Sequence, residues 1–81
     1  MNQQRRIKFI NTVSKVSKYD IGDRIREFRE SLKMSQAKFG KLIGFGNSTI
    51  SRYESGQFQN INPNLLYGIV RYGGSLNKIF S

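Results

Sequence analysis

Apolar residues recur at helical spacing along most of the chain and predict a series of short helices. The clearest pattern begins after Asp20, where apolar residues spaced i, i+4, i+7 and i+11 form one stripe: Ile21, Ile25, Phe28 and Leu32. Charged side chains occupy the other faces, which is typical of an amphipathic helix. Asp20 is a suitable N-cap, and we expect the helix to end near Lys33.

A second helix is expected after Ser35, whose hydroxyl can accept a hydrogen bond from an unpaired backbone amide of the first turn. Its packing residues are predicted to be Ala37, Phe39, Gly40, Leu42 and Ile43. Gly44 is the expected C-cap, because glycine adopts the left-handed conformation at no steric cost. Phe45 should then turn inward, so a tight corner leads to the next helix.

The helix after this corner is expected to have its N-cap at Asn47 or Gly46, to run to about Ser55 and to stop at Gly56. Its periodicity predicts an amphipathic helix with one apolar and one polar face. The inward positions are Ile50 and Tyr53. The outward positions are Asn47, Ser48, Ser51 and Arg52.

The remaining residues predict a loop over 57–62 and two further helices. Pro63 fits the first turn of a helix, where its missing N–H costs nothing, and Gly73 and Gly74 should end that helix. Its apolar face is expected to hold Leu65, Leu66, Ile69, Val70 and Tyr72. Ser75 is the expected cap of a last short helix with Leu76, Ile79 and Phe80. The pattern as a whole predicts one all-α domain of five short helices over residues 20–81.

Residues 1–19 have a different character, with five basic residues and no acid: Arg5, Arg6, Lys8, Lys15 and Lys18. Ile7, Ile10, Val13 and Val16 recur at every third position, a weak helical stripe, although Val, Ile and Thr also permit a short strand. We interpret this segment as a basic N-terminal arm that lies on DNA phosphates or covers part of a dimer surface.

The overall charge points to a polyanionic partner. Fourteen Lys and Arg against five Asp and Glu give a formal net charge of +9 and a pI near 10.4. A small domain this basic is expected to be drawn to nucleic acid.

Composition also argues against several classes of function. The chain has no cysteine and no histidine, so it has no cysteine nucleophile or thiolate metal ligand, and it lacks the commonest general base and the commonest zinc ligand. We therefore expect no catalytic residues, no metal and no cofactor. The chain shows no signal-peptide pattern and no apolar run of membrane-spanning length. A cytoplasmic protein without a membrane partner is expected.

The chain carries five short motifs in a specific order and spacing: Ile25-Arg26-Glu27-Phe28-Arg29, Ser35-Gln36, Leu42-Ile43-Gly44, Ser48-Thr49-Ile50-Ser51-Arg52-Tyr53-Glu54 and Gly56. As a set they resemble the Cro/CI-type (XRE) helix-turn-helix family of prokaryotic and phage repressors, over about residues 20–80. The resemblance implies a five-helix, lambda-repressor-like DNA-binding domain. It also implies that helix 47–55 enters the major groove of double-stranded DNA.

The family pattern assigns roles residue by residue. Bases would be contacted from helix 47–55 by Asn47, Ser48, Thr49, Ser51 and Arg52. Gln36 would hold a phosphate and support the first base-contacting residue, and Ser55 and Gln57 would bind phosphate through their backbone amides. Arg29 and Glu54 would form an ion pair that ties the first helix to the end of the base-contacting helix.

Two positions depart from the family pattern on the second helix. Lys38 and Gly40 stand where the family often has Glu and Ala. A third departure lies outside that helix: Gly46, at the entry to the next helix, replaces a small polar residue that is common there. A cation in a first helical turn opposes the helix dipole, so Lys38, with Lys41 one turn later, is understandable if a phosphate lies nearby. A solvated lysine that carries a small penalty is the alternative.

The sequence thus predicts a non-enzymatic, sequence-specific transcriptional regulator, a repressor rather than an activator, of the Cro-like or controller type. A homodimer on a palindromic operator is expected, with the dimer surface formed by Tyr72, Leu76, Ile79 and Phe80. No small-molecule ligand is expected, because there is no room for a sensor domain. The alternatives are an antitoxin-type protein that binds a partner protein and its own promoter, and a basic module that binds nucleic acid or membranes non-specifically.

Overall fold

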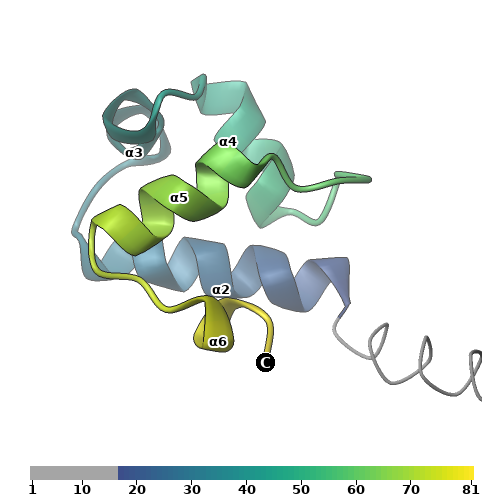
Figure 1. The fold of residues 1–81 in the computed structure, drawn as a ribbon. Coiled ribbons are helices and arrows are strands. Elements are labelled where there is room, and N and C mark those ends of the chain that lie inside the picture. Colours follow the sequence, from purple (N-terminus) through teal and green to yellow (C-terminus); the bar gives the residue numbers. More distant parts are fainter. Residues whose placement is uncertain (1–16) are drawn as a thin grey trace, which may run out of the picture.

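The computed structural model describes residues 17–81, and these residues form five helices and no strand. In chain order the helices are α2 (Lys18–Ser31), α3 (Gln36–Ile43), α4 (Asn47–Glu54), α5 (Pro63–Arg71) and α6 (Leu76–Ile79) (Figure 1). The predicted all-α, five-helix domain is confirmed. Most of the expected basic arm, residues 1–16, lies outside the described residues.

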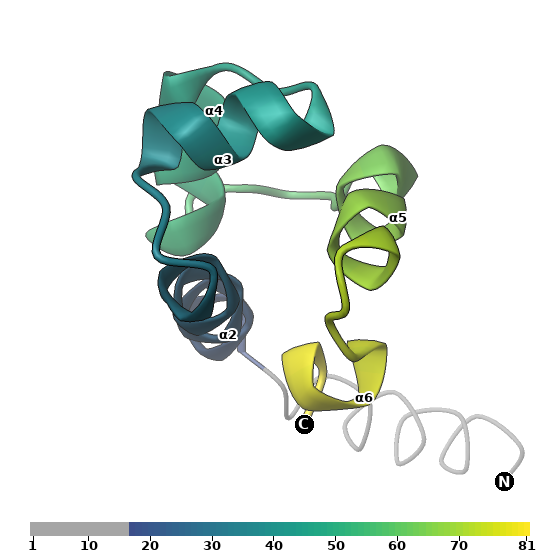
Figure 2. The ribbon, with the colours of Figure 1, turned by 90° about the vertical axis from the view of Figure 1, so that its left-hand side faces the viewer.

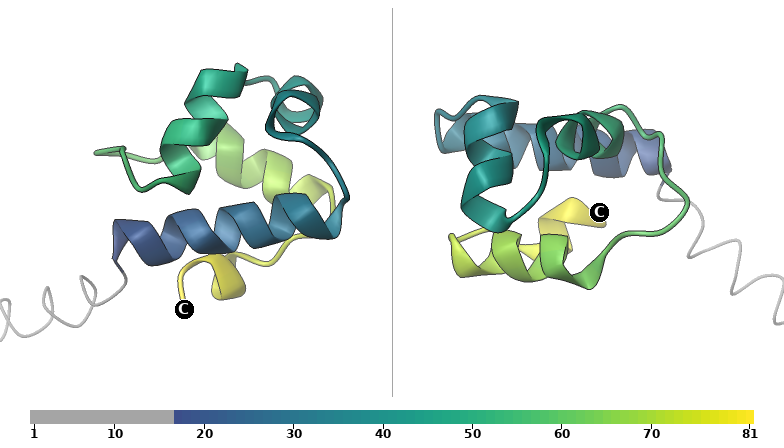
Figure 3. Two further views of the ribbon diagram at one scale, coloured as in Figure 1. Left: turned by 180° about the vertical axis from the view of Figure 1, so that it is seen from behind. Right: turned by 90° about the horizontal axis from the view of Figure 1, so that it is seen from above.

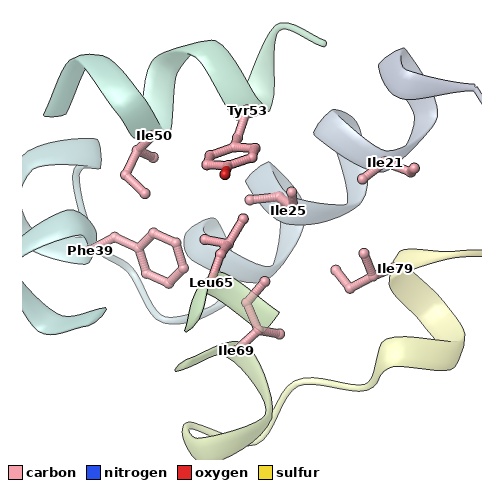
Figure 4. Close-up of a cluster of buried hydrophobic side chains, with 8 residues drawn as sticks. All are labelled: Ile21, Ile25, Phe39, Ile50, Tyr53, Leu65, Ile69 and Ile79. Atoms are coloured by element: carbon pink, nitrogen blue, oxygen red, sulfur yellow. The ribbon is translucent and has the colours of Figure 1, made fainter. Parts of the chain in front are cut away.

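The helices surround one small core. α2 packs against α4 and α6, α3 packs against α4 and α5, and α5 also packs against α6. Seen from the side in Figure 2, α2 and α5 stand opposite each other, with α3 and α4 across one end and α6 at the other. The side chains that fill the space between them (Figure 4) are Ile21, Ile25, Phe39, Ile50, Tyr53, Leu65, Ile69 and Ile79.

Helix α2 begins one turn earlier than the sequence pattern predicted. Its N-cap is Ser17, whose hydroxyl accepts a hydrogen bond from the backbone N–H of Asp20 at 3.0 Å. The expectation that Asp20 is the cap is therefore wrong, and Asp20 instead lies in the first turn, where its negative charge is favourable. At the other end the helix stops at Ser31, two residues before the expected end at Lys33, which adopts a φ of 57°.

The corner between α3 and α4 forms as the glycines predict. Gly44 is the C-cap of α3 with a φ of 89°. The backbone N–H groups of Gly44 and Phe45 both donate to the carbonyl of Gly40, at 2.8 and 2.7 Å. A side chain at Gly40 would collide with the carbonyl oxygen of Phe45, so any larger residue here would force the corner to shift.

One predicted packing residue of α3 faces solvent. Ala37 is exposed, whereas Phe39 and Gly40 are buried and Leu42 and Ile43 are half-buried. Ala37 lies in the first turn of α3, directly after Gln36, so the helix needs no apolar contact at that point. The prediction for Ala37 is wrong.

The C-terminal helices follow their capping signals. Asn62 caps α5 by accepting from the N–H of Asn64 at 2.9 Å, and Pro63 takes the first helical position. Of the predicted apolar positions on α5, Leu65 and Ile69 are fully buried but Val70 is 48% exposed. After Ser75, the short helix α6 places Ile79 in the core at 3% exposure.

Candidate nucleic-acid interface

Helix α4 is held to the body of the domain by its inner face. Ile50 is fully buried, and Tyr53 is 7% exposed, as their spacing predicts. The Tyr53 ring meets Phe45 edge to face at a centroid distance of 6.3 Å. Its hydroxyl accepts a hydrogen bond from the N–H of Asn62 at 3.0 Å. One side chain thus connects α4 to the corner before it and to the loop after it.

A buried ion pair fixes the C-terminal end of α4 to α2. The Arg29 guanidinium donates from Nε to Glu54 Oε2 at 2.6 Å and from Nη2 to Glu54 Oε1 at 3.0 Å. Nη1 donates to the carbonyl of Met34 at 2.8 Å. The hydrogen bond to Glu54 raises the pKa of Arg29 above its ordinary value, although burial acts in the opposite direction. The ion pair implied by the family resemblance is confirmed.

Gln36 joins this network. Its side-chain amide donates to Glu54 Oε1 at 3.1 Å, so the carboxylate of Glu54 is bound by both Arg29 and Gln36. The contact positions Gln36 beside the C-terminal end of α4, whereas the expected support for the first base-contacting residue requires the N-terminal end. In this structure Gln36 therefore helps Arg29 to hold Glu54, and with it the C-terminal end of α4, in place.

The pairing of Glu54 has an electrostatic consequence for the whole surface around α4. From Met34 to Ser81 the sequence contains one acid, and it is Glu54, which is only 4% exposed. The other four acids lie between Asp20 and Glu30, on α2. The outer surface of α3 and α4 therefore carries cations and neutral polar groups, which is the charge pattern that a phosphate backbone attracts.

The five predicted base-contacting residues all lie on α4, and four of them are on its outer face. The N-cap is Gly46, which offers no side-chain hydrogen bond, so Asn47 is the first helical residue and its side chain is not needed as a cap. Thr49 is half-buried, and the other four side chains are exposed. Positions 47, 48, 51 and 52 lie on one face of an α-helix. The exposed side chains are Asn47, Ser48, Ser51 and Arg52.

The predicted phosphate contacts divide into two groups. Lys38 and Lys41 are exposed on α3 and remain available. The backbone amides of Ser55 and Gln57 are already used, because they donate to the carbonyls of Ser51 at 3.0 Å and Arg52 at 2.9 Å. The expectation that these two amides bind phosphate is therefore wrong. The Ser55 hydroxyl is also engaged, because it donates to the carbonyl of Arg52 at 3.2 Å, so the exposed side chain of Gln57 is the group that remains available.

The structure also brings to this surface a basic residue, Lys33, that the sequence pattern did not single out. Lys33 borders a hollow of about 490 Å³ together with Lys38 and Lys41. Its position after α2 and its positive φ turn it toward α3, and only the tertiary structure shows this. On the other side of the domain, Lys18 and Tyr19 lie beside Arg52.

Residues 17–81 contain neither a cluster of potential metal ligands nor a membrane-spanning helix. No group of three or more Asp, Glu, His or Cys side chains is placed to hold a metal ion. No helix in this part of the chain is long and apolar enough to cross a membrane.

Comparisons with known proteins agree with this geometry. Residues 25–76 match the helix-turn-helix family, a span that includes α3, α4 and their corner. Repressor protein C2 of Salmonella phage P22 is 41% identical over 46 residues, which cover 57% of this chain and 21% of that protein. The matched region thus spans about a fifth of the length of this curated relative. No solved structure matches the chain.

Proposed function

The chain belongs to the helix-turn-helix family, as a Cro/CI-type DNA-binding regulator, and from this premise we propose that it represses transcription by binding a specific operator through α4. One observation carries the proposal. The inner face of α4 is fixed to the domain by buried contacts, whereas its outer face presents exposed polar side chains on a surface without exposed acids.

The dimensions and chemistry of α4 suit the major groove. That groove admits one α-helix, and its base edges carry a distinct pattern of donors and acceptors. In helix-turn-helix docking the N-terminal residues of the second helix face the bases, which gives Asn47 and Ser48 the first contacts. Arg52, about one turn later, can donate two hydrogen bonds to guanine O6 and N7. Thr49 and Ser51 complete the base-contacting set.

Phosphate contacts would set the position of the domain on the duplex without adding sequence information. Lys38 and Lys41 carry their charges on exposed positions of α3, Lys38 in its first turn and Lys41 in its last turn, close to the corner that leads into α4. Gln36 retains a second amide hydrogen, which can donate to a phosphate while the first donates to Glu54. At the other end of α4 the exposed side chain of Gln57 would contribute, and Ser55 would do so only by giving up the hydrogen bond from its hydroxyl to the carbonyl of Arg52.

We further propose that the regulator binds as a homodimer on a palindromic site. One short helix contacts few base pairs, and two copies would place two such helices about 34 Å apart on one face of the DNA. The last helices expose apolar side chains suited to this contact: Tyr72 at 38%, Leu76 at 37% and Phe80 at 37%. Ile79, which the sequence analysis also assigned to the dimer surface, belongs to the core instead.

Sedimentation would test the dimer separately from DNA recognition. We expect the protein at tens of micromolar to sediment as a dimer alone, or at least as two copies on one operator duplex. A monomer under both conditions would remove the dimer from the proposal but would leave the role of α4 open.

Repression and a cytoplasmic location follow from the same premise. The relative in phage P22 is a repressor, and a protein that occupies an operator in a bacterial or phage system works where the DNA is. We propose that occupancy depends on the concentration of the protein and not on a small-molecule ligand.

Competition binding tests the proposed function directly. A labelled duplex that carries sites selected from random DNA is bound by the protein at physiological salt, and unlabelled selected or random DNA is added. We expect the selected DNA to compete at least about 10³-fold better than random DNA. A ratio near one would show a non-specific polyanion binder, and the proposal of a sequence-specific regulator would be wrong.

A further inference from the structure

A cleft of about 580 Å³ lies between the start of α2 and the loop that follows α4. The beginning of α2 passes beneath this loop in two opposite views of the molecule (Figures 1 and 3). The polar residues that line the cleft come from both segments and from α4 itself: Lys18, Tyr19, Thr49, Arg52, Gln57 and Gln59. Lys18, Thr49, Arg52 and Gln57 already have expected contacts with DNA, whereas Tyr19, Gln59 and the cleft as a whole have no role so far.

The cleft has a packed floor and a fixed corner. Tyr53 and Phe58, which also line it, pack ring against ring at a centroid distance of 5.3 Å. Gly56 has a φ of 78° and turns the chain away from α4. The ring of Tyr19 lies against Gly56 so closely that a Cβ there would be 2.9 Å from Tyr19 Cδ1. The arrangement leaves Tyr19 71% exposed, an unusual degree for an aromatic ring beside a packed corner.

The chemistry of the lining identifies the kind of occupant. The charged residues at the cleft are Lys18 and Arg52, and no acid is among the described residues that line it. Gln57 and Gln59 add amide donors, and Tyr19 adds an exposed ring next to Lys18. This combination suits a phosphate between cationic and amide donors, with a sugar against an aromatic face.

The position of the cleft favours a phosphate of the DNA backbone over a free phosphate ion as its occupant. Arg52 lines the cleft and also belongs to the outer face of α4, and the half-buried Thr49 lies between the two. A DNA strand that borders the groove proposed for α4 would therefore pass next to the cleft. We propose that the cleft binds the sugar-phosphate backbone of that strand, with Lys18 and the glutamines at a phosphate and Tyr19 against the adjacent sugar.

This inference rests on the proposed docking of α4 and adds a second contact region to it, outside the α3–α4 motif. The region would lie at the start of α2, so that backbone contacts flank α4 on two sides: Lys38 and Lys41 on α3, and Lys18 and Tyr19 across the cleft. Contacts to the backbone carry no base preference, so the cleft would add affinity without changing the selected sequence.

Two variants of the full chain test the cleft by fluorescence anisotropy on a selected operator over a range of salt. For Lys18→Gln we expect affinity about fivefold to tenfold lower near 0.1 M salt, and a slope of log affinity against log salt smaller by about one, because one phosphate contact is lost. For Tyr19→Ala we expect weaker binding with an unchanged salt slope. Both variants should select the same DNA sequence as the unaltered protein.

Matched controls lie elsewhere on the domain. Lys78→Gln on α6 removes the same charge, and Tyr67→Ala on α5 removes a ring that is similarly exposed, at 65%. Both should keep the affinity and salt slope of the unaltered protein. If Tyr19→Ala shows lost helicity by circular dichroism, Tyr19→Leu replaces it, because leucine keeps an apolar contact on Gly56 but not the aromatic face.

The outcomes separate this inference from the proposed function. The cleft proposal is overturned if Lys18→Gln keeps the salt slope and Tyr19→Ala keeps the affinity while the unaltered protein still prefers its operator. Absence of any sequence preference in the unaltered protein would instead remove the proposed function, and with it the premise of the cleft.

Discussion

The two faces of α4 differ in how far their side chains contact the rest of the domain. On the inner face, Ile50, Tyr53 and Glu54 are at most 7% exposed, and each packs or hydrogen-bonds with a partner from another part of the fold. On the outer face, the side chains of Asn47, Ser48, Ser51 and Arg52 are exposed, and no hydrogen bond from them to another described residue is formed. One face stabilises the domain, and the other is free to contact a partner.

This difference implies that substitutions around α4 should separate into two classes. Changes on the inner face, or in what it contacts, should lower the free energy of unfolding and thereby remove binding as well. Changes on the outer face should alter binding and leave the free energy of unfolding almost unchanged. Four substitutions, followed by one selection experiment, probe this separation.

The largest effect is expected from Arg29→Ala, which leaves the buried Glu54 carboxylate without its ion-pair partner. Removal of one member of a buried pair typically costs about 3–5 kcal/mol of unfolding free energy, a large share of the stability of a small domain. Urea unfolding followed by circular dichroism measures the loss. DNA binding should fall in parallel, because the C-terminal end of α4 is no longer tied to α2.

Arg24→Ala is the matched control for this substitution. Arg24 pairs with Glu27 at 3.0 Å within α2, with side chains 35% and 61% exposed, and exposed pairs contribute less than about 1 kcal/mol. If Arg29→Ala and Arg24→Ala had equal, small effects, the buried network would not be what holds α4 in place.

A smaller loss of stability is expected from Gly40→Ala. The added methyl group would meet the carbonyl oxygen of Phe45, which belongs to the backbone and can move only with the corner itself. Overpacking of this kind costs about 1–3 kcal/mol. Alanine is the residue that the family often has at this position. An increase in the urea midpoint would therefore show that the corner relaxes around the methyl group and that our account of the corner is too rigid.

Lys38→Ala should affect binding rather than folding. We expect weaker binding to all DNA sequences alike and a salt slope smaller by about one, because one phosphate contact is removed. The unfolding free energy should rise by a few tenths of a kcal/mol, since a cation leaves the first turn of α3. Anisotropy titrations at several salt concentrations, with Lys78→Ala as the control, measure the slope; no change would identify Lys38 as a solvated residue only.

The smallest effect is expected from Gly46→Ser at the N-cap of α4. Gly46 has φ and ψ of −71° and 158°, close to the −69° and 164° of Ser35, which caps α3 with its hydroxyl. Space is open around Gly46, so a serine there can accept a hydrogen bond from the first turn of α4. A gain of a few tenths of a kcal/mol is expected, measurable by thermal unfolding, and a loss would argue against this cap geometry.

Local patterns predicted most of the fold because each helix carries its own start and stop signals. Ser35, Gly44, Pro63 and Gly73 act within a turn of their own position, and the structure places helix ends at or next to each of them. The start of α2 was misplaced because Ser17 and Asp20 are both good caps, and the apolar stripe that begins at Ile21 does not distinguish them.

The candidate site was less predictable wherever a role depends on a distant partner. The hydrogen bond from Gln36 to Glu54 could be predicted only with knowledge of how α3 crosses the end of α4. The backbone amides of Ser55 and Gln57 were expected to be free because the sequence does not show the hydrogen bonds that they donate to the carbonyls of Ser51 and Arg52. Lys18 and Arg52 are 34 positions apart in the chain, and no periodicity relates them, so the cleft between them is visible only in the folded domain.

Selection of binding sites from random DNA with the unaltered protein and with Arg52→Ala tests the central claim, that the outer face of α4 recognises bases, most directly. We expect the unaltered protein to enrich a two-fold symmetric sequence, and Arg52→Ala to lose the preference at one position in each half-site. That loss corresponds to about 1–3 kcal/mol of discrimination, with the unfolding free energy unchanged. Enrichment of the same sequence by both proteins, with every position retained, would contradict the assignment of Arg52 and of this face of α4.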